Sequence, residues 1–177
     1  MTKILLHIER HTRWIDRLNQ ILAHRVRWFA FAMVVITFSI AALRYTFSIG
    51  SIALQESVMY LHGTLFMLAI PYALQRDDHV RVDLLYSRLS KKHQSWIDIT
   101  GHLLLLLPLC GFLVVVSLPY VAASWRIAEG SSEVGGIPAI FLLKSLIPAM
   151  AILLFLQGVR EIVKKLSCIS QQSYLWT

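Results

Sequence analysis

Charged residues are scarce in this chain. Only 15% of its residues are Asp, Glu, Lys or Arg, whereas soluble domains carry about a quarter, and its mean hydropathy is +0.62. This balance excludes an ordinary soluble domain and favours a membrane protein. A length of 177 residues leaves room for one compact membrane domain.

Cysteine and recognisable catalytic motifs are also scarce. Cys110 lies inside an apolar run and Cys168 lies near the C-terminus, a pattern that favours neither a disulfide framework nor a zinc site. The chain has no glycine-rich phosphate loop and no nucleophile beside a convincing base. We therefore expect no catalytic residue, no bound metal and no enzyme activity.

Long uncharged stretches, in contrast, are abundant. A helix needs roughly 20 mostly apolar residues to cross the hydrocarbon core of a bilayer. Charges interrupt residues 1–27 too often for the apolar core of a signal peptide. The sequence predicts an all-α integral membrane protein with four spans, at approximately 27–48, 52–74, 96–122 and 138–160.

The lysines and arginines predict the orientation of these spans. All of them except Arg44, Arg126 and Lys144 fall within residues 1–27, 75–92 and 160–165. Because positive charge accumulates on the cytoplasmic side of membrane proteins, both termini and the 75–92 connector are expected in the cytoplasm. The net charge of +7 then needs no nucleic-acid partner to explain it.

The chain is accordingly divided into three parts. Residues 1–26 form a basic cytoplasmic segment, residues 27–160 the four-helix membrane domain, and residues 161–177 a cytoplasmic tail. Helical periodicity in the first part predicts an amphipathic helix on membrane lipids. A cytoplasmic extension of the first span is the alternative.

Three charged residues lie inside the expected spans, where charge is costly. Arg44, Glu56 and Lys144 each sit about 6–9 Å from the outer end of a different helix, at 1.5 Å per residue. An ion pair of Glu56 with Lys144 or Arg44 is one interpretation. The other interpretations are that these residues contact lipid headgroups, a partner subunit or a transported anion.

No cofactor is expected. His62 and His102 would have to lie at one depth to share a haem, but their expected depths differ by about 10 Å. The possible metal ligands in residues 77–83 are interrupted by Arg81 and preceded by Arg76. Hydrogen bonding between helices is the simpler role for the two histidines.

The 75–92 connector, QRDDHVRVDLLYSRLSKK, mixes acidic and basic residues densely. Val82, Leu85, Tyr86 and Leu89 have the spacing of one helical face, which predicts a short surface helix. Ser90 is placed to cap the next span. The basic residues suit a lipid anchor, but the aspartates weaken one unless they pair with arginines here or in a partner.

These residues resemble a family. HVRVDLLYSRLS after the second of four spans, LFMLAIPYALQRDDHVRVD around it, and SWRIAEGSSEVGGIPAIFLLKSLIP with LLFLQGV are similar to the small, DctQ-like membrane subunit of tripartite ATP-independent periplasmic (TRAP) transporters. The last two stretches resemble the mannitol/chloroaromatic-compound branch. The resemblance covers most of residues 25–163.

The resemblance implies a bacterial inner-membrane transporter in three parts. A periplasmic solute-binding protein delivers an organic acid, and a large elevator-type subunit moves it by ion-coupled symport. The small subunit scaffolds the large one. A stand-alone homo-oligomeric exporter is the competing hypothesis, but such an exporter would be expected to carry an acidic residue in the middle of a span.

The resemblance also suggests contact residues. In the cytoplasmic connector they are Asp78, His79, Arg81 and Asp83. On the outer side, Glu129 and Glu133 either face the binding protein or belong to a solvated loop. No substrate-binding residue is assigned.

Overall fold

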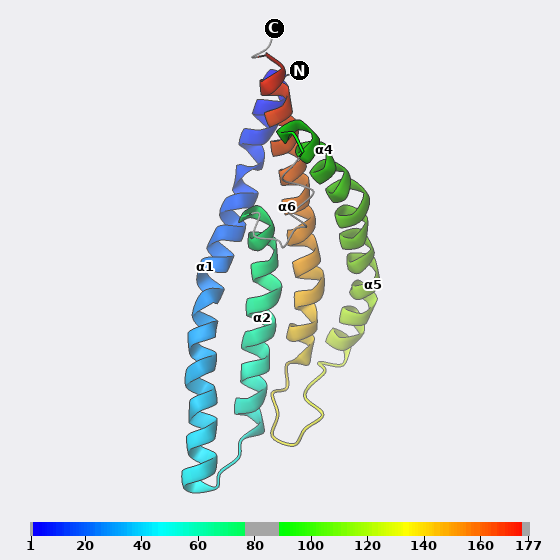
Figure 1. Ribbon diagram of the computed structural model, residues 1–177. Coiled ribbons are helices and arrows are strands. Elements are labelled where there is room, and N and C mark those ends of the chain that lie inside the picture. The colour runs from blue at the N-terminus through cyan, green and yellow to red at the C-terminus, as the bar shows by residue number, and fades with distance from the viewer. Residues whose placement is uncertain (1, 77–88, 175–177) are drawn as a thin grey trace.

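The computed structural model describes residues 2–76 and 89–174, and all regular structure in them is helical (Figure 1). Four helical segments are long and apolar enough to cross a membrane, by length and composition, which confirms the all-α prediction with four candidate spans. They are His7–Phe47, Ile52–Arg76, Lys92–Arg126 and Ile140–Ser170. The short helix predicted within residues 82–89 falls almost entirely outside the described residues.

The helices are arranged around α6 (Ile140–Tyr174). α1 (Thr2–Phe47) and α2 (Ile52–Arg76) pack against each other and against α6. α5 (Leu107–Arg126) packs on α6, on the far side from α1 (Figure 1). The start of α1 and the end of α6 lie at the same end of the molecule (Figure 1), called the inner end below; the other is the outer end.

The N-terminal segment is helical, as predicted, but it is not a separate helix. α1 runs unbroken for 46 residues, about 70 Å at 1.5 Å per residue, because no glycine or proline interrupts it. This is the arrangement of the alternative interpretation, an extension of the first span. Its position relative to a membrane stays a prediction.

The SIGS stretch at residues 48–51 predicts a tight turn between the first two spans, and the turn between α1 and α2 is tight. Ser48 adopts a left-handed φ of 57°. Its N–H donates to the Arg44 carbonyl at 3.1 Å, and the Ile49 N–H donates to the Leu43 carbonyl at 3.2 Å. These two bonds form a Schellman motif, which satisfies the last carbonyls of α1 and reverses the chain within four residues.

The third candidate span is a continuous, curved helix of three parts: α4 (Lys91–Gly101), η1 (His102–Leu106) and α5. Ser90 caps α4 by accepting a hydrogen bond from the His93 N–H, as predicted. The π-helical turn η1 ends two residues before Pro108, which has no N–H to donate. The Leu107 N–H donates to the His102 carbonyl, five residues back, so the widened turn accommodates the proline within the span.

Two glycines allow close approach to α6. A Cβ on Gly63 of α2 would lie 2.9 Å from Cδ1 of Leu143, and a Cβ on Gly158 of α6 would lie 2.8 Å from Cδ2 of Leu106. The first contact brings α2 onto α6, and the second brings η1 onto α6. Small residues at such crossings are typical of helices that pack within membranes.

Candidate functional site

Glu56 in the second turn of α2 reaches across to the connector between α5 and α6. Its Oε1 accepts a hydrogen bond from the Ser131 hydroxyl, and its Oε2 accepts one from the Ile137 N–H at 2.6 Å. One carboxylate therefore holds both ends of the loop formed by residues 131–137.

Lys144 pairs with a different carboxylate. Its Nζ lies 2.5 Å from Oε2 of Glu129 and 4.2 Å from the centroid of the Tyr120 ring. The Lys144 ammonium, as hydrogen-bond donor, holds the pKa of Glu129 below its ordinary value. The ion pair thus ties the start of the connector to the first turns of α6.

The predicted ion pair of Glu56 with Lys144 or Arg44 is therefore wrong. Position along a helix gave similar depths for the three residues, but the connector folds back between the helices and supplies nearer partners. Ser131 and Ile137 satisfy Glu56, and Glu129 satisfies Lys144.

The connector itself is an ordered turn. The Ser131 N–H donates to the Ile137 carbonyl at 3.2 Å, and the Gly136 N–H donates to the Glu133 carbonyl at 3.1 Å. A Cβ on Gly136 would lie 2.5 Å from the Cβ of Ser131 and 2.7 Å from Oε1 of Glu56, so the close packing of these two side chains favours glycine here. We call residues 127–139, held by Glu56 and Lys144, the outer cap.

The tip of the outer cap is exposed. Glu133 is exposed, and its neighbour Val134 is 93% exposed. Gly135 follows with a φ of +82°, a conformation that glycine adopts without strain. Of the two acids predicted at this face, Glu129 is engaged by Lys144, whereas Glu133 stands at the free tip.

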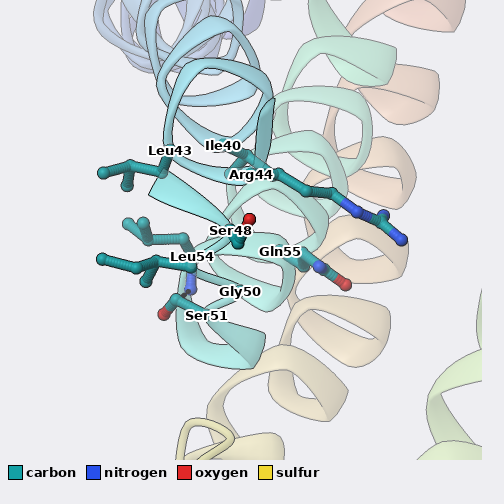
Figure 2. A pocket seen from close by; sticks show the side chains of 9 residues that line it. Ile40, Leu43, Arg44, Ser48, Gly50, Ser51, Leu54 and Gln55 are labelled. Carbon is teal, nitrogen blue, oxygen red and sulfur yellow. Dashed lines mark hydrogen bonds between the residues drawn. The ribbon is translucent and has the colours of Figure 1, made fainter. Parts of the chain in front are cut away.

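Arg44 lies at the same end of the molecule, beside the turn between α1 and α2. It lines a hollow with polar groups of Ser48, Ser51 and Gln55. Figure 2 shows that Arg44 and Gln55 point to one side, and that Leu43 and Leu54 point to the other. Arg44 forms no ion pair within the described part of the chain.

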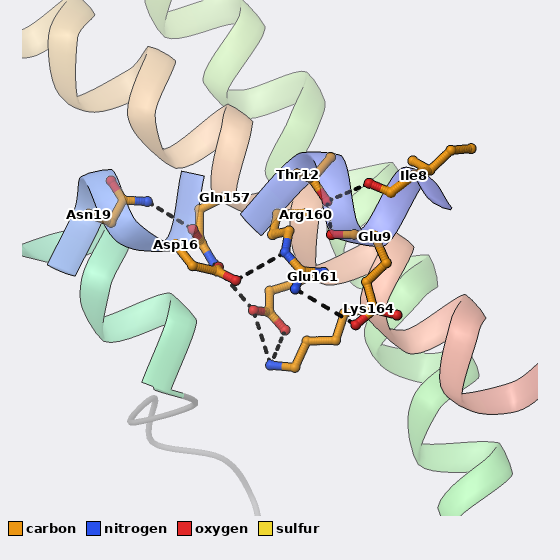
Figure 3. A network of polar contacts seen from close by, with 9 residues as sticks. All are labelled: Ile8, Glu9, Thr12, Asp16, Asn19, Gln157, Arg160, Glu161 and Lys164. Atoms are coloured by element: carbon orange, nitrogen blue, oxygen red, sulfur yellow. Dashed lines mark hydrogen bonds and ion pairs between the residues drawn. The ribbon is translucent and has the colours of Figure 1, made fainter. Parts of the chain in front are cut away.

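A buried polar network joins α1 to α6 at the inner end (Figure 3). Asn19 and Gln157 are fully buried, and the Asn19 Nδ2 donates to the Gln157 Oε1 at 2.8 Å. The Arg160 Nε donates to Oδ2 of Asp16 at 3.0 Å, with both side chains at least four-fifths buried. The network therefore fixes the N-terminal half of α1 along α6.

Two further carboxylates extend this network. Glu9 lies 3.9 Å from the Arg160 guanidinium, and Glu161 accepts hydrogen bonds from Gln157 and Lys164. A separate ion pair joins Lys165 to Asp98 of α4 at 2.6 Å. All three acids thus lie against basic or amide groups of α6.

The sequence interpretation missed this network because it counted the basic residues of the tail only as topological signals. A pattern in the sequence points to it. The polar residues on α6 have i, i+3, i+4, i+7 spacing, and the matching α1 residues recur every three or four residues, as expected of two facing helix stripes. They are Gln157, Arg160, Glu161 and Lys164 on α6, and Glu9, Thr12, Asp16 and Asn19 on α1.

Asp78, His79, Arg81 and Asp83, predicted as a cytoplasmic contact, lie outside the described residues. His62 stacks on Phe66 within α2, and the His102 ring contacts the Asp98 carbonyl at 2.5 Å. Within residues 2–76 and 89–174, no three His, Cys, Asp or Glu side chains form a group suited to a metal ion.

Comparison with protein families gives one match. The family model described as "Tripartite ATP-independent periplasmic transporters, DctQ component" matches residues 33–168, a range that includes α2, α5, the outer cap and most of α6. Comparisons with curated proteins and with solved structures found no match.

Proposed function

This chain belongs to the DctQ component family of tripartite ATP-independent periplasmic transporters, and on that premise we propose that it scaffolds the large membrane subunit and does not itself move solute. The family is non-enzymatic, and the chain is a multi-pass membrane component of such a transporter. The family implies a tripartite system, with a large permease and a binding protein as partners.

One observation carries the scaffold proposal. The middle of every candidate span is free of charged residues, namely residues 28–43, 57–75, 99–125 and 145–159. The ion pairs in the described structure lie instead near the ends of the helices, in the outer cap and in the inner network. A subunit that moves an anion would be expected to present polar groups or broken helices near the midplane.

A second observation is consistent with a subunit that packs against a larger protein. Large apolar side chains are exposed along α1 and α5, which form the two flanks of the molecule. Phe38 of α1 is 74% exposed and Val115 of α5 is 70% exposed. Lipid and a partner subunit together would cover such faces, since a thin row of helices buries little of its own surface.

The remaining details of transport follow from the resemblance. We propose ion-coupled uptake of an organic acid, delivered by a periplasmic binding protein to an elevator-type large subunit. The branch suggested by SWRIAEGSSEVGGIPAIFLLKSLIP is the mannitol/chloroaromatic-compound type. The basic residues at the inner end support a cytoplasmic location for both termini, so the outer cap would face the periplasm of a bacterial inner membrane.

The outer cap is the proposed contact with the binding protein. Its backbone is fixed by Glu56 and Lys144, and the exposed Glu133 and Val134 lie at its tip. A rigid tip loses little conformational freedom on docking. Exchange of both tip residues, by Glu133→Lys with Val134→Ser, is expected to weaken stimulation of transport by the binding protein without reducing membrane insertion.

The cytoplasmic motif is the proposed contact with the large subunit. Charge reversal at Asp78, Arg81 and Asp83 together is expected to lower the yield of the complex while the chain still inserts. Unchanged assembly and unchanged uptake would reduce the motif to a topological anchor.

The scaffold proposal is tested by co-purification. The tagged chain, extracted in mild detergent from cells that express the whole system, is expected to retain a much larger multi-span protein in defined stoichiometry. Recovery of a homodimer with substrate flux of its own would instead support the stand-alone exporter.

A further inference from the structure

We propose that the N-terminal half of α1 carries a binding site for the phosphate-bearing headgroup of an anionic phospholipid, formed by Arg10, Arg13 and Arg17 with Trp14 beside them. This inference rests on the chain alone and is independent of its role in a transporter.

The first observation is that α1 sorts its charges by face. Glu9 and Asp16 point to α6, where Arg160 lies 3.9 Å and 3.0 Å from them. Arg10 and Arg17 have i, i+7 spacing on the other face. The inward carboxylates therefore do not neutralise the outward arginines.

The second observation is that these arginines have no acidic partner among residues 2–76 and 89–174. None of the three forms an ion pair with the described residues. All three are exposed, as is Trp14 at 54%. Together with His11 they line a hollow of about 410 Å³, which is large enough for a phosphodiester group. Guanidinium groups bind phosphate oxygens in a bidentate manner.

The third observation concerns the position of the arginines along the long axis of the molecule. It follows from the residues of α6 that α1, α4 and η1 contact. Asp16 of α1 pairs with Arg160, whereas α4 pairs with α6 five residues further, through Asp98 and Lys165. η1 meets α6 two residues before Arg160, at Gly158. Arg10–Arg17 thus lie level with the junction of α4 and η1.

That junction indicates where the bilayer ends. The Leu103, Leu104 and Leu105 side chains are 54%, 65% and 73% exposed, and such a run of exposed leucine is suited to lipid acyl chains. Trp96 of α4, 49% exposed, has the side chain favoured at the interface between membrane and water. The three arginines of α1 therefore lie level with this interfacial tryptophan.

The same face of α1 continues into an apolar stripe. Ile21, Trp28 and Phe31 are 59%, 62% and 65% exposed, and they follow Arg17 toward the outer end. The exposed basic side chains of His24, Arg25 and Arg27 lie among them. A phospholipid has a negatively charged head and an apolar tail in this order, whereas nucleic acid or free phosphate would leave the apolar stripe unused. Charge and apolar surface together select an anionic lipid.

The test compares two triple variants of the full chain in detergent by native mass spectrometry, titrated with phosphatidylglycerol and phosphatidylcholine. One variant carries Arg10→Gln, Arg13→Gln and Arg17→Gln. The control carries Arg25→Gln, Arg27→Gln and Lys92→Gln, which remove the same charge from exposed positions outside the hollow. Unchanged circular dichroism and elution volume establish that each variant is folded.

The native chain is expected to retain phosphatidylglycerol in preference to phosphatidylcholine. The first variant is expected to lose this preference by at least about tenfold, because each basic residue near an anionic surface contributes about fivefold. The control is expected to lose much less of this preference.

Two single variants complete the test. Trp14→Ala, which leaves the charge intact, is expected to weaken retention of phosphatidylglycerol severalfold. Arg13→Gln replaces the triple variant if the triple variant does not fold.

Three results would overturn the proposal. Equal losses in the two triple variants would indicate a diffuse positive surface without a site. Displacement of the lipid by millimolar inorganic phosphate would indicate a site for soluble anions. Equal retention of the two lipids by the native chain would exclude selection of anionic headgroups.

Discussion

At the residue scale, Glu56 shows how a costly charge in a membrane helix is used. The carboxylate accepts from the Ser131 hydroxyl and from the Ile137 N–H, and hydrogen bonds to a charged acceptor are stronger than those between neutral groups. Glu56 thereby closes a loop that belongs to two other helices. Its role is to shape the outer cap, and it does not pair with a second charge.

Glu56→Gln is expected to loosen the outer cap. The neutral amide has one acceptor oxygen where the carboxylate has two, so both donors lose a charged acceptor and either the Ser131 hydroxyl or the Ile137 N–H loses its acceptor altogether. We expect hydrogen exchange at the Ile137 amide to accelerate by about tenfold, because a neutral amide oxygen is a weaker acceptor than a carboxylate oxygen. Glu133→Gln, at the exposed tip, serves as the control, and identical exchange in the two variants would contradict the assigned role of Glu56.

Acidification is expected to release the start of the outer cap. Lys144 lowers the pKa of Glu129 from its ordinary 4.5, so the ion pair contributes stability above that pH. This contribution is lost as the pH falls through the lowered pKa. Thermal unfolding of the purified chain should thus become less pH-dependent below pH 4.5 in Glu129→Gln, and an unchanged pH dependence would show that the pair contributes nothing.

The residue scale also shows what the sequence can and cannot predict. It identified Arg44, Glu56 and Lys144 as residues that needed an explanation, because charge inside an apolar span is costly. It paired them wrongly, because spacing along a helix gives depth and not the path of a connector. The bonds of Ser131 and Ile137 depend on a fold-back that no periodicity encodes.

At the element scale, the stiffness of the inner end depends on the pairing of α1 with α6. Arg160 is 4% exposed and lies among Asp16, Glu9 and Gln157. Removing one partner of a buried ion pair leaves the other charge uncompensated, at a cost of about 3–5 kcal/mol. The long N-terminal half of α1 is held in register by this network.

Arg160→Leu is therefore expected to lower the thermal unfolding midpoint of the purified chain clearly. Lys164→Leu, four residues along the same helix, should change it little, because Lys164 is 49% exposed in its pair with Glu161 and such pairs contribute under about 1 kcal/mol. The double variant Asp16→Leu with Arg160→Leu should recover part of the loss. Equal effects of the two single variants would contradict the buried pair.

The crossing of η1 and α6 at Gly158 provides a separate test. Gly158→Leu places a side chain where Cδ2 of Leu106 lies 2.8 Å from a Cβ, and overpacking of this kind costs about 1–3 kcal/mol. Gly111→Leu on α5 is the matched control, since nothing lies within 4 Å of a Cβ there. A lower unfolding midpoint is expected for Gly158→Leu alone, and similar midpoints would argue against a close crossing.

At the scale of the whole molecule, the family was suggested by the resemblance of particular stretches such as HVRVDLLYSRLS, and the family model confirms it. Composition and hydropathy predicted the four candidate spans and the tight turn between the first two. These features follow from bilayer thickness and from local turn chemistry, which act on short stretches of sequence. The order of the helices around α6 and the buried network could not be predicted, because they depend on which faces meet. The unbroken α1 was one of two alternatives that local periodicity could not separate.

The central claim is that this chain supports transport without carrying solute. Uptake of a radiolabelled organic acid into proteoliposomes tests it most directly, with the chain alone, the large subunit alone, and both together with the binding protein. The account predicts ion-dependent uptake when all three proteins are present and no uptake by this chain alone. Solute flux through liposomes that contain only this chain would contradict it.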